Sequence, residues 1–119
     1  MRKFFIVFLI LVPAFFVNAE FVGPNTSSTY NSVKDVLNNP VDDTFVVLKG
    51  HIIKKLNNKK YLFKDDTGQI TVEISYKKIR HLHITPKILV EIHGKIDIDH
   101  FPTNSVEIEV KRINVIKNG

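Results

Sequence analysis

The stretch YLFKDDTGQITVEI, from Tyr61 to Ile74, decides the fold of this chain. Apolar and polar residues alternate on both sides of the turn Asp-Asp-Thr-Gly at residues 65–68. Such alternation around a glycine-containing turn is typical of a β-hairpin with one buried face. Pairing across the turn sets Phe63 opposite Ile70 and Tyr61 opposite Val72. We therefore expect these four side chains on the inner face of a sheet.

Further strands are predicted on both sides of this hairpin. Apolar residues alternate with other residues over 45–53, 88–98 and 106–115. The alternation changes phase between Val110 and Ile113, as a β-bulge would cause. Gly50 and Gly94 fall on the inward phase of long strands, where a small barrel needs sharp coiling.

Two short helices are expected. Ser32 with Asp35 three residues later predicts a helix start, and the Asn-Pro pair at 39–40 ends that helix. Its expected apolar face comprises Val33, Val36 and Leu37. A second short segment follows the third strand, with three apolar residues at helical spacing: Tyr76, Ile79 and Leu82.

Five strands with a helical link between the third and fourth follow the order of an OB-fold. The predicted fold class is therefore all-β, a five-stranded OB-fold barrel with a short N-terminal helix and a short helical link between strands 3 and 4. An SH3-like barrel or a small sandwich would share much of the pattern, and the link over residues 76–82 favours the OB arrangement.

The first nineteen residues are predicted to be a signal peptide. Arg2 and Lys3 precede an apolar run, and small or aliphatic residues end the segment at 17–19. The alternative is a membrane anchor, but the run is shorter than the ~20 residues of a spanning helix and contains Pro13. We expect cleavage after Ala19, location in the periplasm, and no membrane span afterwards.

Residues 20–119 are predicted to form one OB-fold domain, which is long enough for a single core. Loss of Arg2 and Lys3 lowers the formal net charge from +5 to +3, which does not demand a polyanionic partner. The chain has no cysteine, so neither disulfides nor lipoprotein attachment can stabilise or anchor it.

Several pieces of the chain resemble the bacterial OB-fold (BOF) family of exported proteins. They are Phe21-Val22-Gly23-Pro24, Asp42-Asp43, Val46-x-Leu48-x-Gly50-x-Ile52, the hairpin itself, Thr85-Pro86, Val90-x-Ile92-x-Gly94-x-Ile96-Asp97-x-Asp99 and Glu107-Ile108-x-Val110. The resemblance implies a periplasmic OB-fold protein associated with tolerance of envelope stress, without established catalytic activity. The family usually carries a tryptophan in the link after the third strand. This chain has none, so Ile79 or Leu82 must fill that place.

The candidate ligand-binding surface is the outer face of the first three strands. Strand alternation places six polar side chains on this face or at its edge: Lys49, His51, Lys64, Asp65, Thr71 and Glu73. Each of them could equally be an ordinary solvated strand residue, and Asp65 with Asp66 could serve the turn. The resemblance favours a functional role for Asp65 and for the pair Asp97 and Asp99.

Two other classes of site, a metal site and a catalytic site, have weaker support in the sequence. The pair His81 and His83 could bind a metal together with His51, His93 or His100. Zinc sites normally have three or four ligands, and no carboxylate is tightly spaced with this pair. Catalysis has little support, because the chain lacks a cysteine nucleophile, a Gly-x-Ser-x-Gly elbow and a phosphate-binding glycine loop. We expect no cofactor.

The sequence therefore predicts an exported, non-enzymatic OB-fold ligand-binding protein of the bacterial envelope that contributes to stress tolerance. Its expected partner is a small ligand, glycan or peptide, and the protein is expected to be a monomer. One alternative is a nucleic-acid-binding OB module. Exposed aromatics would then stack bases, whereas Tyr61 and Phe63 are expected inside. The other alternative is a periplasmic metal-binding protein that uses its histidines.

Overall fold

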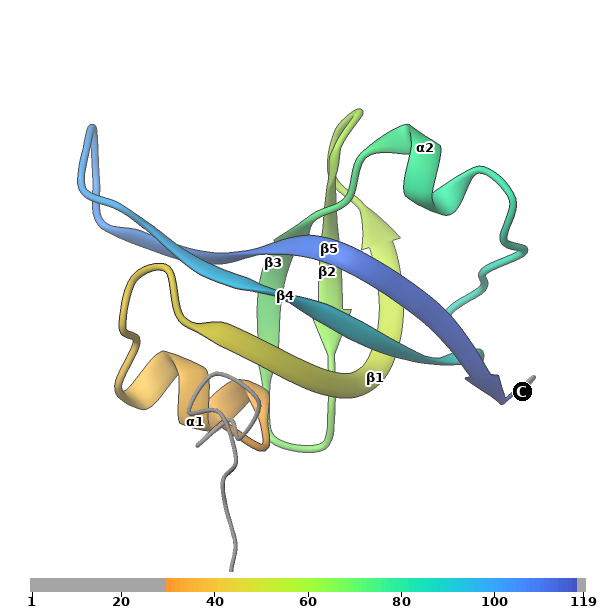
Figure 1. Ribbon diagram of the computed structural model, residues 1–119, viewed down its shortest axis with the longest axis horizontal. Coiled ribbons are helices and arrows are strands. Elements are labelled where there is room, and N and C mark those ends of the chain that lie inside the picture. Colours follow the sequence, from red (N-terminus) through yellow and green to blue (C-terminus); the bar gives the residue numbers. More distant parts are fainter. Residues whose placement is uncertain (1–29, 118–119) are drawn as a thin grey trace, which may run out of the picture.

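The computed structural model describes residues 30–117 (Figure 1). The predicted signal peptide at residues 1–19 and its cleavage site lie outside the described residues. Within the described part of the chain, neither helix has the length and apolar character needed to cross a membrane.

Five strands close into a barrel in the order β1-β2-β3-β5-β4. The elements along the chain are α1 (Val33–Asn38), β1 (Phe45–Lys55), β2 (Lys60–Lys64), β3 (Gln69–Glu73), α2 (Tyr76–Ile79), β4 (Leu89–Asp99) and β5 (Ser105–Lys117). The predicted all-β OB-fold barrel is confirmed, with its N-terminal helix and with the helical link between β3 and β4 (Figure 1).

Strand β1 bends so that it belongs to both sides of the barrel. Residues 45–50 pair with β4, and residues 51–55 pair with β2. Gly50 lies at the bend, where an added Cβ would meet the Lys64 carbonyl oxygen and would lie 2.7 Å from Phe63 Cζ. The bend therefore requires glycine, as the inward phase of Gly50 predicted.

The β2–β3 hairpin has the predicted register. Phe63 pairs with Ile70, and Tyr61 pairs with Val72. The turn closes through a hydrogen bond from the Asp65 amide to the Gly68 carbonyl oxygen, 3.0 Å. All four paired residues are buried, so their predicted place inside the barrel is confirmed.

Strands β4 and β5 form a long hairpin, and β5 also pairs in parallel with β3. This parallel pairing closes the barrel. The register of β4 against β5 shifts between His93 and Gly94, which confirms the bulge expected between Val110 and Ile113. Val115 follows that bulge but lies near the strand end and is 36% exposed.

The core is mainly aliphatic, and it also contains Tyr30, Tyr61 and Phe63. Its largest fully buried side chains are Phe63, Leu48, Ile74, Ile92, Ile96 and Ile108. Every element of the barrel contributes to this set or to the smaller valines around it. No charged or polar side chain is buried among the described residues.

Helix α1 begins as predicted, because Ser32 Oγ accepts a hydrogen bond from the Asp35 amide at 3.1 Å. Val33 and Val36 are fully buried, but Leu37 is 45% exposed. The expected three-residue apolar face is therefore wrong at Leu37, since a helix of six residues presents only one turn to the barrel.

Helix α2 is also shorter than the predicted segment. It ends at Ile79, and Leu82 is reached through a turn closed by its amide on the Ile79 carbonyl oxygen, 3.0 Å. Ile79 and Leu82 pack against the core, whereas Tyr76 is 68% exposed. The helical spacing thus identified two of three inward residues; Tyr76 is the first residue of a single turn and does not face the barrel.

Candidate functional site

The predicted ligand-binding residues begin at the centre of the β1–β2 pair. His51 pairs directly with Lys64, and Lys49 lies two residues earlier on the same face of β1. Lys49 and Lys64 are exposed, while His51 is half-buried. The outward placement of these three residues agrees with the strand alternation.

Three of the six predicted residues line one shallow polar pocket. His51, Lys64, Asp65 and Asp66 surround a volume of about 230 Å³, which we call the outer pocket. It offers an imidazole, an ammonium and carboxylate oxygens within one concave surface. Asp66 was interpreted only as a turn residue, and nothing in its strand-end position distinguished it from Asp65.

A contact with a backbone carbonyl holds the His51 ring in place. Its Nδ1 lies 2.9 Å from the Ile88 carbonyl oxygen, which can only accept a hydrogen bond. Nδ1 therefore carries the proton, and Nε2 of the neutral ring is left as an acceptor. The partner residue lies 37 positions away, so no sequence pattern indicates it.

Asp65 has a structural role that its turn position only partly suggested. Its Oδ1 accepts hydrogen bonds from the Thr67 amide, the Thr67 hydroxyl and the Gly68 amide at 2.7, 2.6 and 3.1 Å. Its Oδ2 accepts from the Val33 amide at 2.9 Å and so ties the hairpin turn to α1. Both carboxylate oxygens are already bonded within the protein.

The pKa of Asp65 reflects these bonds. Partial burial acts to raise it, but the hydrogen bonds from Thr67, Val33 and Gly68 stabilise the carboxylate and hold the pKa below its usual value. Asp65 is therefore an ionised residue of the pocket wall, with less capacity left for a ligand than Asp66.

Thr71 and Glu73 do not line the outer pocket. Thr71 of β3 is paired with Leu62 of β2 on one side and with Glu107 of β5 on the other. Glu73 of β3 is paired with Lys60 of β2. Lys60 Nζ also forms a 2.9 Å ion pair with Glu107, and this hydrogen bond raises the pKa of Lys60. Thr71 and Glu73 thus belong to a second polar stretch of the same outer face, further along β3.

Asp97 and Asp99 lie near the opposite end of the long strands. Burial, and then the neighbouring charge of Asp42, raise the pKa of Asp97 above its usual value. Asp42 also accepts a hydrogen bond from the Ile98 amide at 2.8 Å. This corner is an accumulation of like charge rather than a set of converging ligands.

The histidines do not converge either. Among residues 30–117, no three His, Asp or Glu side chains are placed to hold a metal ion. His93 instead lies 2.9 Å from Glu91, and this hydrogen bond lowers the pKa of Glu91. His81 lies beside Arg80, and His100 beside Asn104.

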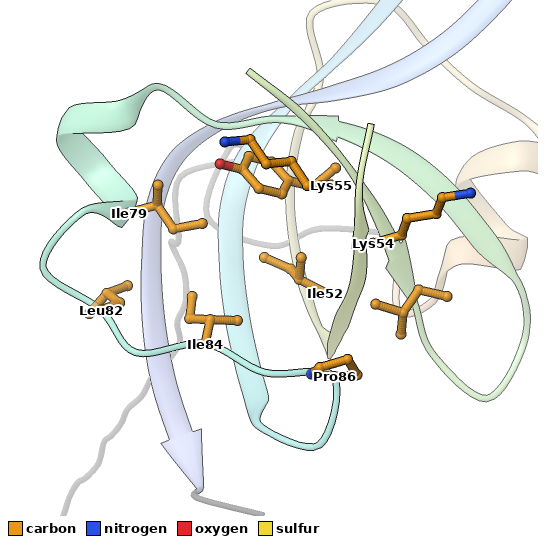
Figure 2. Close-up of a pocket in the computed structure, with 9 residues that line it drawn as sticks. Ile52, Lys54, Lys55, Ile79, Leu82, Ile84 and Pro86 are labelled. Atoms are coloured by element: carbon orange, nitrogen blue, oxygen red, sulfur yellow. The ribbon is translucent and has the colours of Figure 1, made fainter. Parts of the chain in front are cut away.

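A larger pocket was missed by the sequence analysis. It lies between the end of β1 and the link that follows α2, has a volume of about 320 Å³, and we call it the link pocket. Figure 2 shows Ile79 at the end of α2, and Leu82 and Ile84 in the link, facing the strand that carries Ile52. Lys55 reaches toward α2. The signal was present in Ile79 and Leu82, which were interpreted only as residues that fill space.

Comparison with known proteins identifies relatives of the whole fold. The family model "Bacterial OB fold (BOF) protein" matches residues 14–115. Protein YgiW of Escherichia coli K12 is 44% identical over 75 residues, which are 63% of this chain and 55% of YgiW. The chain thus spans about half the length of this curated relative. The calcium-regulated OB-fold protein CarO of Pseudomonas aeruginosa is 36% identical over 99 residues, 83% of this chain and 82% of CarO.

Solved structures show the same arrangement. The structure of the hypothetical protein ygiW from E. coli has 37% identity, a TM-score of 0.67, and covers 83% of this chain and 100% of its own. A mitochondrial single-stranded DNA-binding protein of S. cerevisiae, Rim1, has 18% identity and a TM-score of 0.52, and covers 66% of this chain and 98% of its own. At that identity the likeness concerns the fold alone.

Proposed function

Because this chain belongs to the bacterial OB-fold (BOF) family, we propose that it is an exported, non-enzymatic ligand-binding protein of the bacterial envelope. Residues 1–19 direct export, residues 20–119 work in the periplasm, and the protein contributes to tolerance of envelope stress. One curated relative is named as a calcium-regulated OB-fold protein, which supports a role that uses the OB-fold.

The observation that carries this proposal is the outer pocket. Its ammonium, imidazole and carboxylate groups converge from β1, β2 and the β2–β3 turn on a volume of about 230 Å³. Groups of both signs suit a polar ligand with several hydroxyl, amide or zwitterionic groups, such as an envelope glycan or a short peptide. Thr71 and Glu73 extend the same face for a longer ligand.

The arrangement of these groups favours binding over catalysis. His51 Nδ1 is held by a backbone carbonyl rather than by a carboxylate. Among the residues that the structure describes, no serine or threonine hydroxyl lines the outer pocket with it. Asp65 is occupied by four hydrogen bonds and has a pKa below its usual value, so it is a poor general acid at neutral pH.

The test is capture of ligands on the immobilised protein from soluble cell-wall fragments and envelope glycans, with identification by mass spectrometry. Lys64→Ala and Glu73→Ala should weaken binding of the captured compound while the melting temperature stays the same. Exposed strand positions usually change stability by less than about 0.5 kcal/mol.

Asp97→Ala and Asp99→Ala serve as controls for Lys64→Ala, because they remove charges at the end of β4 away from the outer pocket. They are not controls for Glu73→Ala, because Asp97 pairs with Glu107, which is also the neighbour of Thr71. Normal binding by the Lys64 and Glu73 variants, together with loss of binding in these controls, would move the site to that end. Capture of no compound by the folded protein would argue against a binding role altogether.

A further inference from the structure

The link pocket is apolar and lies at the other end of the β1–β2 pair from the outer pocket. In that pair, His51 faces Lys64 at one end, and Lys55 faces Tyr61 at the other. The walls of the link pocket are aliphatic side chains of the link and of β1, together with the buried Tyr61. A volume of about 320 Å³ lies near the lower limit for small-molecule pockets, which suits a single alkyl chain.

The rim of the link pocket is cationic. Lys54 and Lys55 line it, and Lys55 Nζ lies 6.0 Å from the centre of the Tyr61 ring. Figure 2 shows the Lys55 ammonium on the α2 side of the pocket, while the Lys54 ammonium points away. Lys55 is therefore the charged group placed to meet a ligand at the mouth.

The chain segments that form the link pocket contain no acidic residue. No Asp or Glu occurs in residues 44–64 or 74–90, which supply the rim and the link. Eight Lys or Arg residues lie in 54–60 and 76–87 alone. Within the described chain, Lys60 pairs with Glu107, but Lys54, Lys55 and Lys87 form no ion pair. Glu107 and Glu73 act on Lys60, but no Asp or Glu is among the residues that line the link pocket. The positive potential at its rim therefore attracts an anion.

We propose that the link pocket binds a single-chain anionic amphiphile, with its alkyl chain among Ile79, Leu82 and Ile84 and its anionic head group at Lys55. The ligand class is a fatty acid or a monoacyl lipid with a phosphate head group. This site is separate from the outer pocket and does not depend on what that pocket binds.

The experiment measures binding of dodecanoate and dodecyl phosphate to the purified protein by calorimetry, below their micellar concentrations. Dodecyl maltoside and dodecyltrimethylammonium carry the same chain with an uncharged or cationic head group. We expect saturable 1:1 binding of an anionic compound. Dodecyl maltoside and dodecyltrimethylammonium should bind about tenfold more weakly, because the Lys55 charge attracts only an anionic head group. Comparison of dodecanoate with dodecyl phosphate distinguishes a fatty acid from a monoacyl lipid with a phosphate head group. Equal affinity for all four compounds would overturn the proposal.

Two variants and a matched control locate the site. Lys55→Glu should weaken binding of the anion by about tenfold, because it replaces an attraction by a repulsion. Lys64→Glu makes the same change in the outer pocket and should leave amphiphile binding unchanged. Leu82→Trp should fill the link pocket and abolish binding of all alkyl compounds. If Leu82→Trp does not fold, the comparison of Lys55→Glu with Lys64→Glu still locates the binding site.

Chemical-shift mapping and vesicles complete the test. Amide shifts on addition of dodecanoate should concentrate in residues 52–56 and 76–86. Shifts confined to the outer pocket would overturn the proposal. So would binding to phosphatidylglycerol vesicles without binding of the monomeric anions, since the cationic end would then adsorb on a lipid surface rather than hold one chain.

Discussion

Asp65 shows how a single residue connects two elements that lie far apart in the sequence. Its carboxylate receives the Val33 amide of α1 as well as three donors from its own turn. In Asp65→Asn one of the two oxygens becomes a donor that faces other donors. We expect a loss of about 1–2 kcal/mol in the free energy of unfolding at pH 7, measured by denaturant titration.

The loss should depend on pH. Because the folded-state pKa of Asp65 lies below its usual value, the ionised carboxylate contributes stability above that usual value, and this contribution disappears as the pH falls through the folded-state pKa. The stability difference between wild type and Asp65→Asn should therefore shrink below about pH 4. Asp66→Asn is the control, because Asp66 is exposed. Equal losses in the two variants would refute the structural role of Asp65.

Gly94 tests the close approach of strands in the barrel. An added Cβ there would meet the Glu109 carbonyl oxygen and would lie 2.9 Å from Ile108 Cγ2. Gly94→Val should cost about 1–3 kcal/mol through overpacking. Gly68→Ala is a matched control, because its Cβ would make only an ordinary contact of 3.5 Å with Val33. A melting temperature unchanged by Gly94→Val would show that the strands separate easily.

Residue roles were predictable from the sequence only where they follow from strand alternation. The inward positions of Tyr61, Phe63 and Gly94 were correct for that reason. The partners of His51 and Asp65 lie 37 and 32 residues away, and local patterns carry no information on such contacts. The candidate site was therefore predicted as a face of the sheet, while its division into an outer pocket and a Glu73 stretch required the fold.

At the scale of elements, α1 depends on the hairpin turn for its stability. Six residues are far fewer than the ~12–15 that an isolated helix needs, so tertiary contacts must hold it. Two such contacts come from the turn, since the amides of Val33 and Lys34 donate to Asp65 and Thr67. The helix and the turn therefore form one unit.

Thr67→Val should loosen this unit without affecting the barrel. The substitution removes the acceptor of the Lys34 amide and a donor to Asp65. We expect faster hydrogen exchange in α1 and unchanged exchange at the core of β4, because the barrel strands keep their pairing. Uniformly faster exchange in all elements would mean that α1 unfolds only together with the whole domain.

The elements also show where prediction from sequence ends. Alternation over 61–74 predicted both strands of the hairpin and their register, because a tight turn fixes the pairing. The parallel pairing of β3 with β5 joins residues more than thirty positions apart, so the alternation within either strand did not indicate it. The link pocket was missed because its lining residues come from two segments that are separated in the sequence, 52–61 and 79–86.

At the scale of the whole molecule, charge is distributed unevenly. The segments 54–60 and 76–87 contain eight basic residues and no acidic ones, and the rest of residues 30–117 contains seven basic and eleven acidic residues. Both segments line or adjoin the link pocket, where the β1–β2 tip and α2 lie side by side (Figure 1). The modest net charge therefore hides a strongly cationic end.

This uneven charge distribution bears on whether the protein binds single-stranded DNA. A cationic end alone gives weak attraction that salt screens, whereas tight binding needs aromatic surfaces that stack bases at about 1–3 kcal/mol each. Tyr61 and Phe63 are buried, and the exposed rings of Tyr76 and Phe101 lie on separate parts of the molecule, α2 and the β4–β5 turn (Figure 1). Within residues 30–117 the molecule thus has charge at one end but no stacking platform.

Fluorescence anisotropy with a labelled oligonucleotide should therefore show binding weaker than about 1 μM at 0.15 M salt, with affinity falling steeply as salt rises. Lys54→Glu with Lys55→Glu should remove most of the residual binding at low salt, because these residues belong to the cationic end. Lys95→Glu is the control, since Lys95 lies at the other end of the barrel beside Asp43. Submicromolar affinity that persists at 0.3 M salt would require base stacking and would favour the nucleic-acid-binding alternative over an envelope ligand.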